Sequence, residues 1–306
     1  MQQDSPARNI IVAAFYRFHS LEQPEALKTG LLAACETLGV RGTILLAPEG
    51  VNGTISGSRE GIDAALAAVR ALPGMAPLEA KESLHDAHPF GRMRVKLKRE
   101  IVTMGVAGLA PGERTGEHVP PERWNALIRD PGVKLIDTRN RYEVHLGTFE
   151  GAIDPETESF RDFPDWVARE LDPARDRRVA MFCTGGIRCE KATAYLLEQG
   201  FESVYQLEGG ILNYLEQVPA DASAWRGECF VFDDRVTVDH ALEAGEVEVC
   251  PNCRIPILPG EKDLPEFEEH VSCVHCFDRT TERRRAGLAE RRRQETLAQV
   301  RGESEA

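Results

Sequence analysis

The segment 179–197 constrains the fold of this chain more than any other part of the sequence. An apolar run ends in Cys183, a Gly185-Gly186 pair follows, and a helical pattern begins at Ile187. This pattern predicts a buried strand, a tight loop and a helix, with a thiol at the carboxyl end of the strand. The loop N–H groups and the helix N-terminus favour negative charge there, and Arg188 adds a positive charge. We therefore expect the Cys183 thiolate to be favoured over the thiol, and the thiolate is the reactive form.

Cys183 could act as a nucleophile or as a sulfur carrier. Alternatively, it could be a buried structural cysteine at a strand end. Four residues separate Cys183 from Arg188, one fewer than in the cysteine-phosphatase pattern. The spacing instead resembles the rhodanese (sulfurtransferase) loop, which holds a persulfide on its cysteine. We expect Cys183 and Arg188 to be catalytic, in a loop that also contains Thr184, Gly185, Gly186, Ile187 and Cys189. Cys189 could resolve an oxidised Cys183, or it could be a small residue in the first helical turn.

The sequence on both sides of the loop extends the rhodanese resemblance. Residues 133–139 resemble an Ile-Asp-x-Arg strand end, and Glu143 and residues 147–153 stand where the family has a glutamate and a glycine-containing turn. Residues 204–211 resemble the closing strand and double glycine. Short apolar strands alternate with helical patterns, which independently favours a parallel α/β sheet. We expect the rhodanese domain at about residues 118–218.

A separate pattern covers the first third of the chain, and we assign residues 1–105 to one domain. Expected strands at 10–16, 42–47, 53–56 and 93–98 and expected helices at 24–38 and 58–72 give the order βαββαβ. This order is typical of a ferredoxin-like or acylphosphatase-like α+β domain. Ser58 is the expected N-cap of the second helix. Met93, Val95 and Leu97 should face one side of the last strand.

The other side of that strand and its flanks are strongly basic. Five cations occur within eight residues: Arg92, Arg94, Lys96, Lys98 and Arg99. They could bind RNA phosphates. Alternatively, they could form a solvated sheet edge, because charged residues also protect edge strands from pairing with another chain.

Residues 106–117 contain glycine and proline without periodicity and are expected to be a linker. A third region follows Pro219 and extends over residues 219–306. Two Cys-x-x-Cys knuckles, Cys250/Cys253 and Cys273/Cys276, stand nineteen residues apart. This spacing predicts a structural zinc site with four thiolate ligands, rather than free or disulfide-bonded thiols.

An arginine-rich tail follows the second knuckle. Seven arginines lie between residues 279 and 293, with triplets at 283–285 and 291–293. A helix there could grip RNA phosphates, or the segment could be a solvated tail. The net charge of −13 argues against indiscriminate nucleic-acid binding but not against a local basic surface.

The cysteine content and the hydropathy of the sequence indicate the cellular compartment in which the protein works. The eight cysteines are mostly clustered, which suits metal and thiol chemistry in a reducing cytoplasm. No apolar run approaches the roughly 20 residues that a membrane-spanning helix needs, and the N-terminus lacks a secretory signal pattern. We therefore expect a cytoplasmic protein without a membrane partner.

The whole-chain arrangement is more specific than the rhodanese loop. Residues 47–53, 182–192 and 230–235, followed by the paired knuckles, together resemble the rhodanese-type tRNA uridine hydroxylases over about residues 9–276. The resemblance implies oxygen-dependent 5-hydroxylation of the wobble uridine, with molecular oxygen as co-substrate. It also implies that Cys183 is the essential cysteine and that the partner is the anticodon loop of tRNA, not DNA. No flavin, haem or non-haem iron motif is visible, so the sequence assigns no electron donor.

Two rival functions remain open from the sequence. A sulfurtransferase would move a persulfide sulfur to a small acceptor or to tRNA. A non-enzymatic RNA-binding module would rely on the zinc region and the arginines. For the hydroxylase, the Cys183 thiolate either adds to C6 of uracil, which makes C5 nucleophilic toward an oxidant, or carries an oxidised sulfur.

Overall fold

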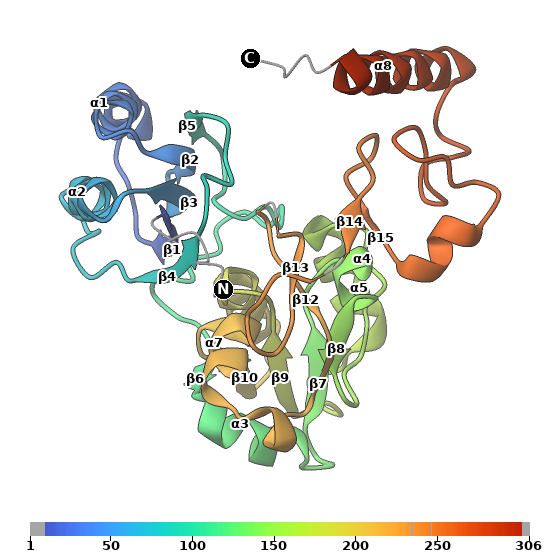
Figure 1. The fold of residues 1–306 in the computed structure, drawn as a ribbon. Helices are drawn as coiled ribbons and strands as arrows, with labels where there is room; N and C mark the ends of the chain where they lie inside the picture. Colours follow the sequence, from blue (N-terminus) through green and yellow to red (C-terminus); the bar gives the residue numbers. More distant parts are fainter. Residues whose placement is uncertain (1–9, 234, 246, 302–306) are drawn as a thin grey trace.

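The computed structural model describes residues 10–233, 235–245 and 247–301 (Figure 1). Residues 1–9 and 302–306, the ends of the expected first and last regions, lie outside this description. The first domain has a five-stranded sheet in the order β4-β1-β3-β2-β5. Its elements are β1 (Ile10–Phe18), α1 (Pro24–Thr37), β2 (Arg41–Ala47), β3 (Gly50–Gly57), α2 (Arg59–Arg70), β4 (Ala80–His85) and β5 (Met93–Leu97).

The two helices of this domain cover one face of the sheet. Phe15, Ile44 and Ile55 point into the core beneath them, together with Leu31 of α1 and Leu66 of α2. Successive residues of a strand point to opposite faces, so Ile11, Ala13 and Phe15 of β1 join this core, whereas Ala14 and Tyr16 lie on the other face. The Ser58 side chain accepts a hydrogen bond from Gly61 N at 3.1 Å, so the expected cap of α2 is present.

The expected strand order of this domain was incomplete. The structure adds β4 at the edge next to β1, and the expected last strand is β5, which pairs in parallel with β2 at the opposite edge. The sequence did not predict β4 because its side chains are mostly exposed or half-buried and show no apolar alternation. Leu97 was also expected on the buried side of β5, but it is 42% exposed because only Met93 and Val95 reach the core.

The central domain is a four-stranded parallel sheet in the order β6-β10-β9-β7. It confirms the expected α/β architecture with a parallel sheet. Its elements are β6 (Glu117–Val119), α3 (Pro121–Ile128), β7 (Lys134–Asp137), α4 (Arg141–Val144), β8 (Gly147–Phe149), the 3₁₀ helix η1 (Phe160–Asp162), α5 (Phe163–Glu170), β9 (Arg178–Phe182), α6 (Ile187–Glu198), β10 (Ser203–Leu207) and α7 (Gly210–Gln217).

Strand β9 lies between two helical layers. Met181 and Cys183 belong to the cluster beneath α5 and α6, whereas Phe182 belongs to the cluster beneath α3 and α7. Burial on both faces explains why β9 is a continuous apolar run rather than an alternating one. It also fixes the position of Cys183 at the carboxyl end of a central strand.

The expected linker, residues 106–117, contains no helix and reaches β6 only at Glu117. Leu109 is nevertheless buried and packs on the α5–α6 side of the central domain. The connection is therefore packed rather than free.

The expected third region begins against the central domain. Trp225, Cys229 and Val238 join the α3–α7 core, and β11 pairs with β8. Beyond this point the chain forms the cysteine knuckles and a helix, α8, that projects from the rest (Figure 1). The elements are η2 (Ala220–Ala222), β11 (Trp225–Gly227), β12 (Cys229–Phe230), β13 (Thr237–Val238), β14 (Glu248–Val249), β15 (Pro256–Ile257), η3 (Pro259–Asp263) and α8 (Glu282–Arg301).

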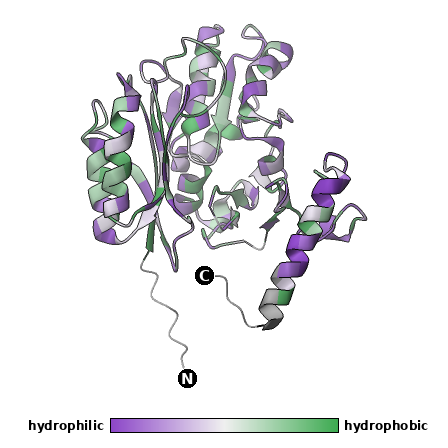
Figure 2. Ribbon diagram, turned by 90° about the horizontal axis from the view of Figure 1, so that it is seen from above, coloured by the Kyte–Doolittle hydropathy of each residue, from purple (hydrophilic) through white to green (hydrophobic). Residues whose placement is uncertain are grey.

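Figure 2 shows that α8 is predominantly hydrophilic, in contrast to the helices of the two sheet domains. Among the helices in the described part of the chain, none has the length and hydrophobicity needed to cross a bilayer.

Candidate active site and metal centre

The loop between β9 and α6 cradles the Cys183 sulfur. Gly186 N donates a hydrogen bond to the Cys183 Sγ at 3.1 Å. Gly186 adopts φ 99°, and a Cβ at this position would lie 2.7 Å from the Tyr16 hydroxyl. Only glycine fits both the backbone conformation and this close approach. The second glycine of the loop pair is therefore required by geometry.

The N-terminus of α7 holds the same loop from the other side. Ile211 N donates to Cys183 O at 2.9 Å, and Leu212 N donates to Thr184 O at 3.1 Å. Gly210 adopts φ 70°, and a Cβ there would lie 2.6 Å from Cys183 O. The double glycine at 209–210 thus lets α7 approach the loop.

Arg188 forms a bidentate ion pair with Glu143. The two oxygen–nitrogen distances are 2.6 and 2.7 Å, and both side chains are buried. Burial would raise the pKa of Glu143, but the charge and hydrogen bonds of Arg188 hold it below its usual range. Glu143 therefore fixes the guanidinium beside the loop, a pairing that sequence spacing alone could not predict.

The surroundings of Cys183 favour its thiolate. Burial alone would raise the pKa of this thiol, but a hydrogen bond from Cys189, the charge of Arg188 and the N–H groups of Cys189 and Arg188 lower it to about 6. Burial and the nearby Cys183 raise the pKa of Cys189 well above its usual value. Cys189 thus stays protonated and donates to the Cys183 sulfur.

Tyr16 of the N-terminal domain lies next to this loop. Its hydroxyl donates to Glu190 Oε1 at 3.3 Å, and Glu190 also pairs with His118 at 2.9 Å. Burial, Glu190 and Cys183 raise the pKa of Tyr16 well above its usual value, so it remains a neutral donor. Cys183 itself has no exposed surface in this arrangement. No motif in the sequence signals this contact between domains.

A buried lysine ties the two domains together beside the loop. Lys191 Nζ lies 2.8 Å from Glu49 and 2.6 Å from Glu100, and it donates to Val102 O at 3.1 Å. Glu49 belongs to the 47–53 motif of the N-terminal domain, and Lys191 belongs to α6. The motif therefore has a visible role in joining the domains.

The five predicted RNA-binding cations lie on or beside the edge strand β5. All five are exposed, and none takes part in an ion pair with another residue that the structure describes: Arg92, Arg94, Lys96, Lys98 and Arg99. Arg92 and Arg94 also line a pocket of about 460 Å³ with Thr43 and Phe90.

Strand register places part of this row on the same sheet face as Tyr16. Lys96 pairs with Leu45, Leu45 with Asn52, and Asn52 with Tyr16. Directly paired residues share a face, and these residues lie on the face opposite α1 and α2. The open face of the sheet thus leads from Lys96 to the tyrosine beside the Cys183 loop.

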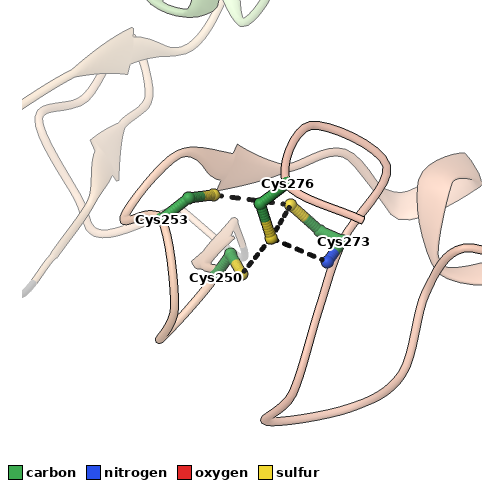
Figure 3. Close-up of side chains that lie close together, drawn as sticks. All are labelled: Cys250, Cys253, Cys273 and Cys276. Atoms are coloured by element: carbon green, nitrogen blue, oxygen red, sulfur yellow. Dashed lines mark hydrogen bonds between the residues drawn. The ribbon is translucent and has the colours of Figure 1, made fainter. Parts of the chain in front are cut away.

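The four predicted metal ligands converge in the C-terminal region (Figure 3). The sulfur atoms of Cys250 and Cys276 are 3.8 Å apart, those of Cys253 and Cys273 3.6 Å, and those of Cys273 and Cys276 3.9 Å. A tetrahedron with metal–sulfur bonds of about 2.3 Å has edges of about 3.8 Å. The cluster could therefore hold a metal ion.

The arginine-rich segment forms α8, and several of its arginines contact the cysteine region. Arg284 donates to Asn252 Oδ1 at 2.8 Å, and Arg292 pairs with Glu269. These contacts show a role in packing α8, and the prediction that the arginines bind RNA stays a prediction.

Comparisons with known proteins agree with the two sheet domains. A family model of the UPF0176 acylphosphatase-like domain matches residues 10–101, and a rhodanese-like domain model matches residues 120–217. The fold and the loop therefore define a rhodanese-type protein with an acylphosphatase-like N-terminal domain. A protein of Ruegeria pomeroyi named tRNA uridine(34) hydroxylase is 58% identical over 292 residues, covering 95% of this chain and 97% of that protein. The chain belongs to the tRNA uridine(34) hydroxylase family.

Solved structures match single domains. A rhodanese-like domain from Anabaena is 21% identical with a TM-score of 0.31, covering 37% of this chain and 80% of that one. An acylphosphatase from Coxiella burnetii is 13% identical with a TM-score of 0.24, covering 31% of this chain and 100% of that one.

Proposed function

We propose that this protein hydroxylates C5 of the wobble uridine, position 34, in the anticodon loop of tRNA, with molecular oxygen as co-substrate. The observation that carries the proposal is the activated Cys183 loop in a chain 58% identical to a tRNA uridine(34) hydroxylase over nearly its full length. A wobble uridine is unpaired in the free anticodon loop, so it can be splayed into a protein site. Action on tRNA agrees with the expected cytoplasmic location.

Cys183 is the proposed catalytic residue, and Arg188 and the loop N–H groups stabilise its thiolate. Addition of the sulfur to C6 of uracil forms a carbon–sulfur bond and moves the displaced electron pair toward C5 and the C4 carbonyl oxygen. C5 then becomes nucleophilic toward an oxidant derived from molecular oxygen. Loss of the C5 proton and expulsion of the thiolate from C6 restore the double bond, while the second oxygen atom leaves as water with two electrons from an external donor. Alternatively, the same oxidant converts Cys183 to a sulfenic acid, and attack by the Cys189 thiol would form a disulfide and release water, with two electrons from the donor restoring both thiols. Because Cys183 is fully buried and Tyr16 lies next to its loop, either route requires the surroundings of the loop to open when RNA binds.

The proposed RNA path crosses the open face of the N-terminal sheet. Arg94 and Lys96 lie at its outer edge, Lys81 lies on β4, and Tyr16 reaches the loop. Lys81 also donates to Gly209 O at 2.8 Å, next to the glycine that supports the loop. Cations on this exposed face suit the phosphates of a single-stranded loop that ends at Cys183.

The four-cysteine cluster is proposed to bind structural zinc. Four thiolates form a closed tetrahedral shell, which leaves no open position for substrate. Cys273 N lies 3.4 Å from the Cys276 sulfur and Asn252 Nδ2 lies 3.5 Å from it, so donors support a thiolate there. Cys250, Cys253, Cys273 and Cys276 would hold the ion and so fix the fold around the two knuckles.

The experiment that tests the function is mass spectrometry of nucleosides from digested tRNA. Cells lacking this protein, and any second route to the same nucleoside, should lose 5-hydroxyuridine and its derivatives, and the wild-type gene should restore them. Sulfur-for-oxygen exchange and oxygen addition change the mass differently. A change in thiolated nucleosides alone would therefore favour the sulfurtransferase, and unchanged tRNA would contradict both enzymatic functions.

A further inference from the structure

An exposed phenylalanine stands beside the proposed active site. Phe232 is 64% exposed, and among the large hydrophobic residues exposed in the described part of the chain it is the aromatic one; the others are leucines. A phenylalanine ring exposed to water lacks the favourable free energy that burial of its large apolar surface usually provides. Its place beside the reactive loop, rather than its exposure alone, makes this ring a candidate contact for an unpaired base.

The segment that carries Phe232 is fixed against the Cys183 loop. The Thr184 hydroxyl donates to Phe230 O at 3.4 Å, and the guanidinium carbon of Arg188 lies 5.9 Å from the centre of the Phe232 ring. Thr184 follows Cys183 directly, and Arg188 is the cation of the same loop. The Phe230 carbonyl and the Phe232 ring thus contact two residues of the Cys183 loop, Thr184 and Arg188.

A second aromatic ring, that of Phe230, packs against Phe232. Phe230 is buried and meets Phe232 edge to face, with ring centres 5.0 Å apart and an interplanar angle of 89°. Tyr142 meets Phe230 in the same way at 5.3 Å and precedes Glu143, the partner of Arg188. Phe230 and the Arg188 guanidinium both contact this ring, and 64% of the Phe232 surface stays exposed.

We propose that Phe232 stacks on the uracil of position 34 and holds it at the Cys183 loop. The inference rests on the proposed function and adds a residue that recognises the base to the cations that bind the backbone. Every base has a flat π face, and aromatic side chains are the usual stacking partners of unpaired bases. The ring carries no charge, so it contributes to binding by a mechanism separate from phosphate contacts.

The first test measures binding of a synthetic anticodon stem-loop RNA with uridine at position 34. Phe232→Ala should weaken binding about 5- to 150-fold, the range observed for loss of one stacked base. Phe232→Leu keeps apolar bulk but loses the aromatic face, so it should bind nearly as poorly, whereas Phe232→Trp should bind like wild type. Leu84→Ala, which truncates an exposed apolar residue on β4, is the matched control and should have no effect.

Salt dependence and an abasic RNA separate stacking from other roles. The loss in Phe232→Ala should be the same factor at every salt concentration, because no ion is displaced from a neutral ring. With an abasic residue at position 34, wild type and Phe232→Ala should bind equally. A loss that persists with the abasic RNA would place Phe232 on another base and overturn the proposal. Wild-type affinity in Phe232→Leu would show that bulk, not stacking, matters.

Activity distinguishes failure of this inference from failure of the proposed function. Tested by complementation in cells, wild type should restore hydroxylation of uridine 34 and Phe232→Ala should restore much less, at equal protein level and melting temperature. Hydroxylation by wild type that is unchanged in Phe232→Ala would overturn the role of Phe232 alone. Absence of hydroxylation with wild type would overturn the proposed function, while the binding comparison would still test the stacking.

Discussion

At the scale of the residue, two opposing effects determine the pKa of the Cys183 thiol. Complete burial favours the neutral thiol, and the Cys189 thiol, the Arg188 charge and the loop N–H groups favour the thiolate. The effects that favour the thiolate outweigh burial, because the donors all converge on one sulfur atom inside a low-dielectric site. Arg188 in turn depends on Glu143, since an unpaired guanidinium at this depth would be costly.

This balance predicts the titration of Cys183. The difference in ultraviolet thiolate absorbance between wild type and Cys183→Ser should rise with a midpoint near pH 6, against the ordinary value of 9.0. Since the pKa is lower in the folded protein, this group stabilises the fold fully above the ordinary value. That contribution is lost as pH falls from about 9 to about 6. A midpoint at or above pH 8 would contradict the account of the loop.

At the scale of the element, the strand–loop–helix unit around Cys183 was predictable because it is local in sequence. An apolar run, two glycines and a helix start lie within one short segment, and each has a direct conformational meaning. The contacts of Tyr16 and Lys191 were not predictable, because they join residues 89 to 174 positions apart. Phe232 lay within a motif that the sequence marked, but only the fold brings its ring to Arg188.

The knuckle region supplies a prediction at the same scale. The cysteine cluster packs only with Ile257 and the partly buried Phe267, and Val271 is a further buried apolar residue nearby, so the fold of this region should depend on the metal. Removal of the metal with a chelator should unfold the region around residues 248–280 while the two sheet domains keep their hydrogen-exchange protection. Elemental analysis should find zinc in wild type and not in Cys250→Ser. Unchanged protection around the knuckles after complete metal removal would contradict a structural role.

At the scale of the whole molecule, the proposed site is built between domains. The central domain supplies Cys183 and Arg188, the N-terminal domain places Tyr16 beside the loop, and the chain after β12 adds Phe232. Lys191 holds the first two domains together through Glu49 and Glu100. The division of the sequence into separate units therefore predicted the folds but not the site that they share.

Lys191→Met tests this connection. The substitution leaves two carboxylates next to each other without their cation, and we expect it to destabilise the domain contact by about 3–5 kcal/mol. Faster hydrogen exchange in residues 47–53 and at the start of α6 would report this destabilisation. Arg59→Met removes a cation that also pairs with two carboxylates, Asp63 and Glu82, but at an exposed site. It should cost no more than about 1 kcal/mol, and equal effects of the two variants would contradict the account.

The cations of β5 give a second prediction at this scale. Arg94→Gln with Lys96→Gln should weaken binding of an anticodon stem-loop RNA. The slope of log affinity against log salt should fall by about 1.4, or about 0.7 for each single-strand phosphate that the protein no longer neutralises. Arg123→Gln with Arg129→Gln removes the same charge from α3 and its C-cap on the central domain and should leave the slope unchanged. Equal slopes for the two pairs would exclude β5 from the RNA path.

A comparison of Cys183→Ser with Cys35→Ser tests whether the Cys183 thiol is essential for hydroxylation. Both substitutions change a buried thiol to a hydroxyl, but Cys35 lies on the buried face of α1 in the core of the N-terminal domain. Each variant is expressed in cells that lack this protein and any second route to the product, and tRNA nucleosides are analysed by mass spectrometry. We predict that Cys35→Ser restores 5-hydroxyuridine-derived nucleosides and that Cys183→Ser, at equal protein level, restores none. Full restoration by Cys183→Ser would remove this thiol from the mechanism.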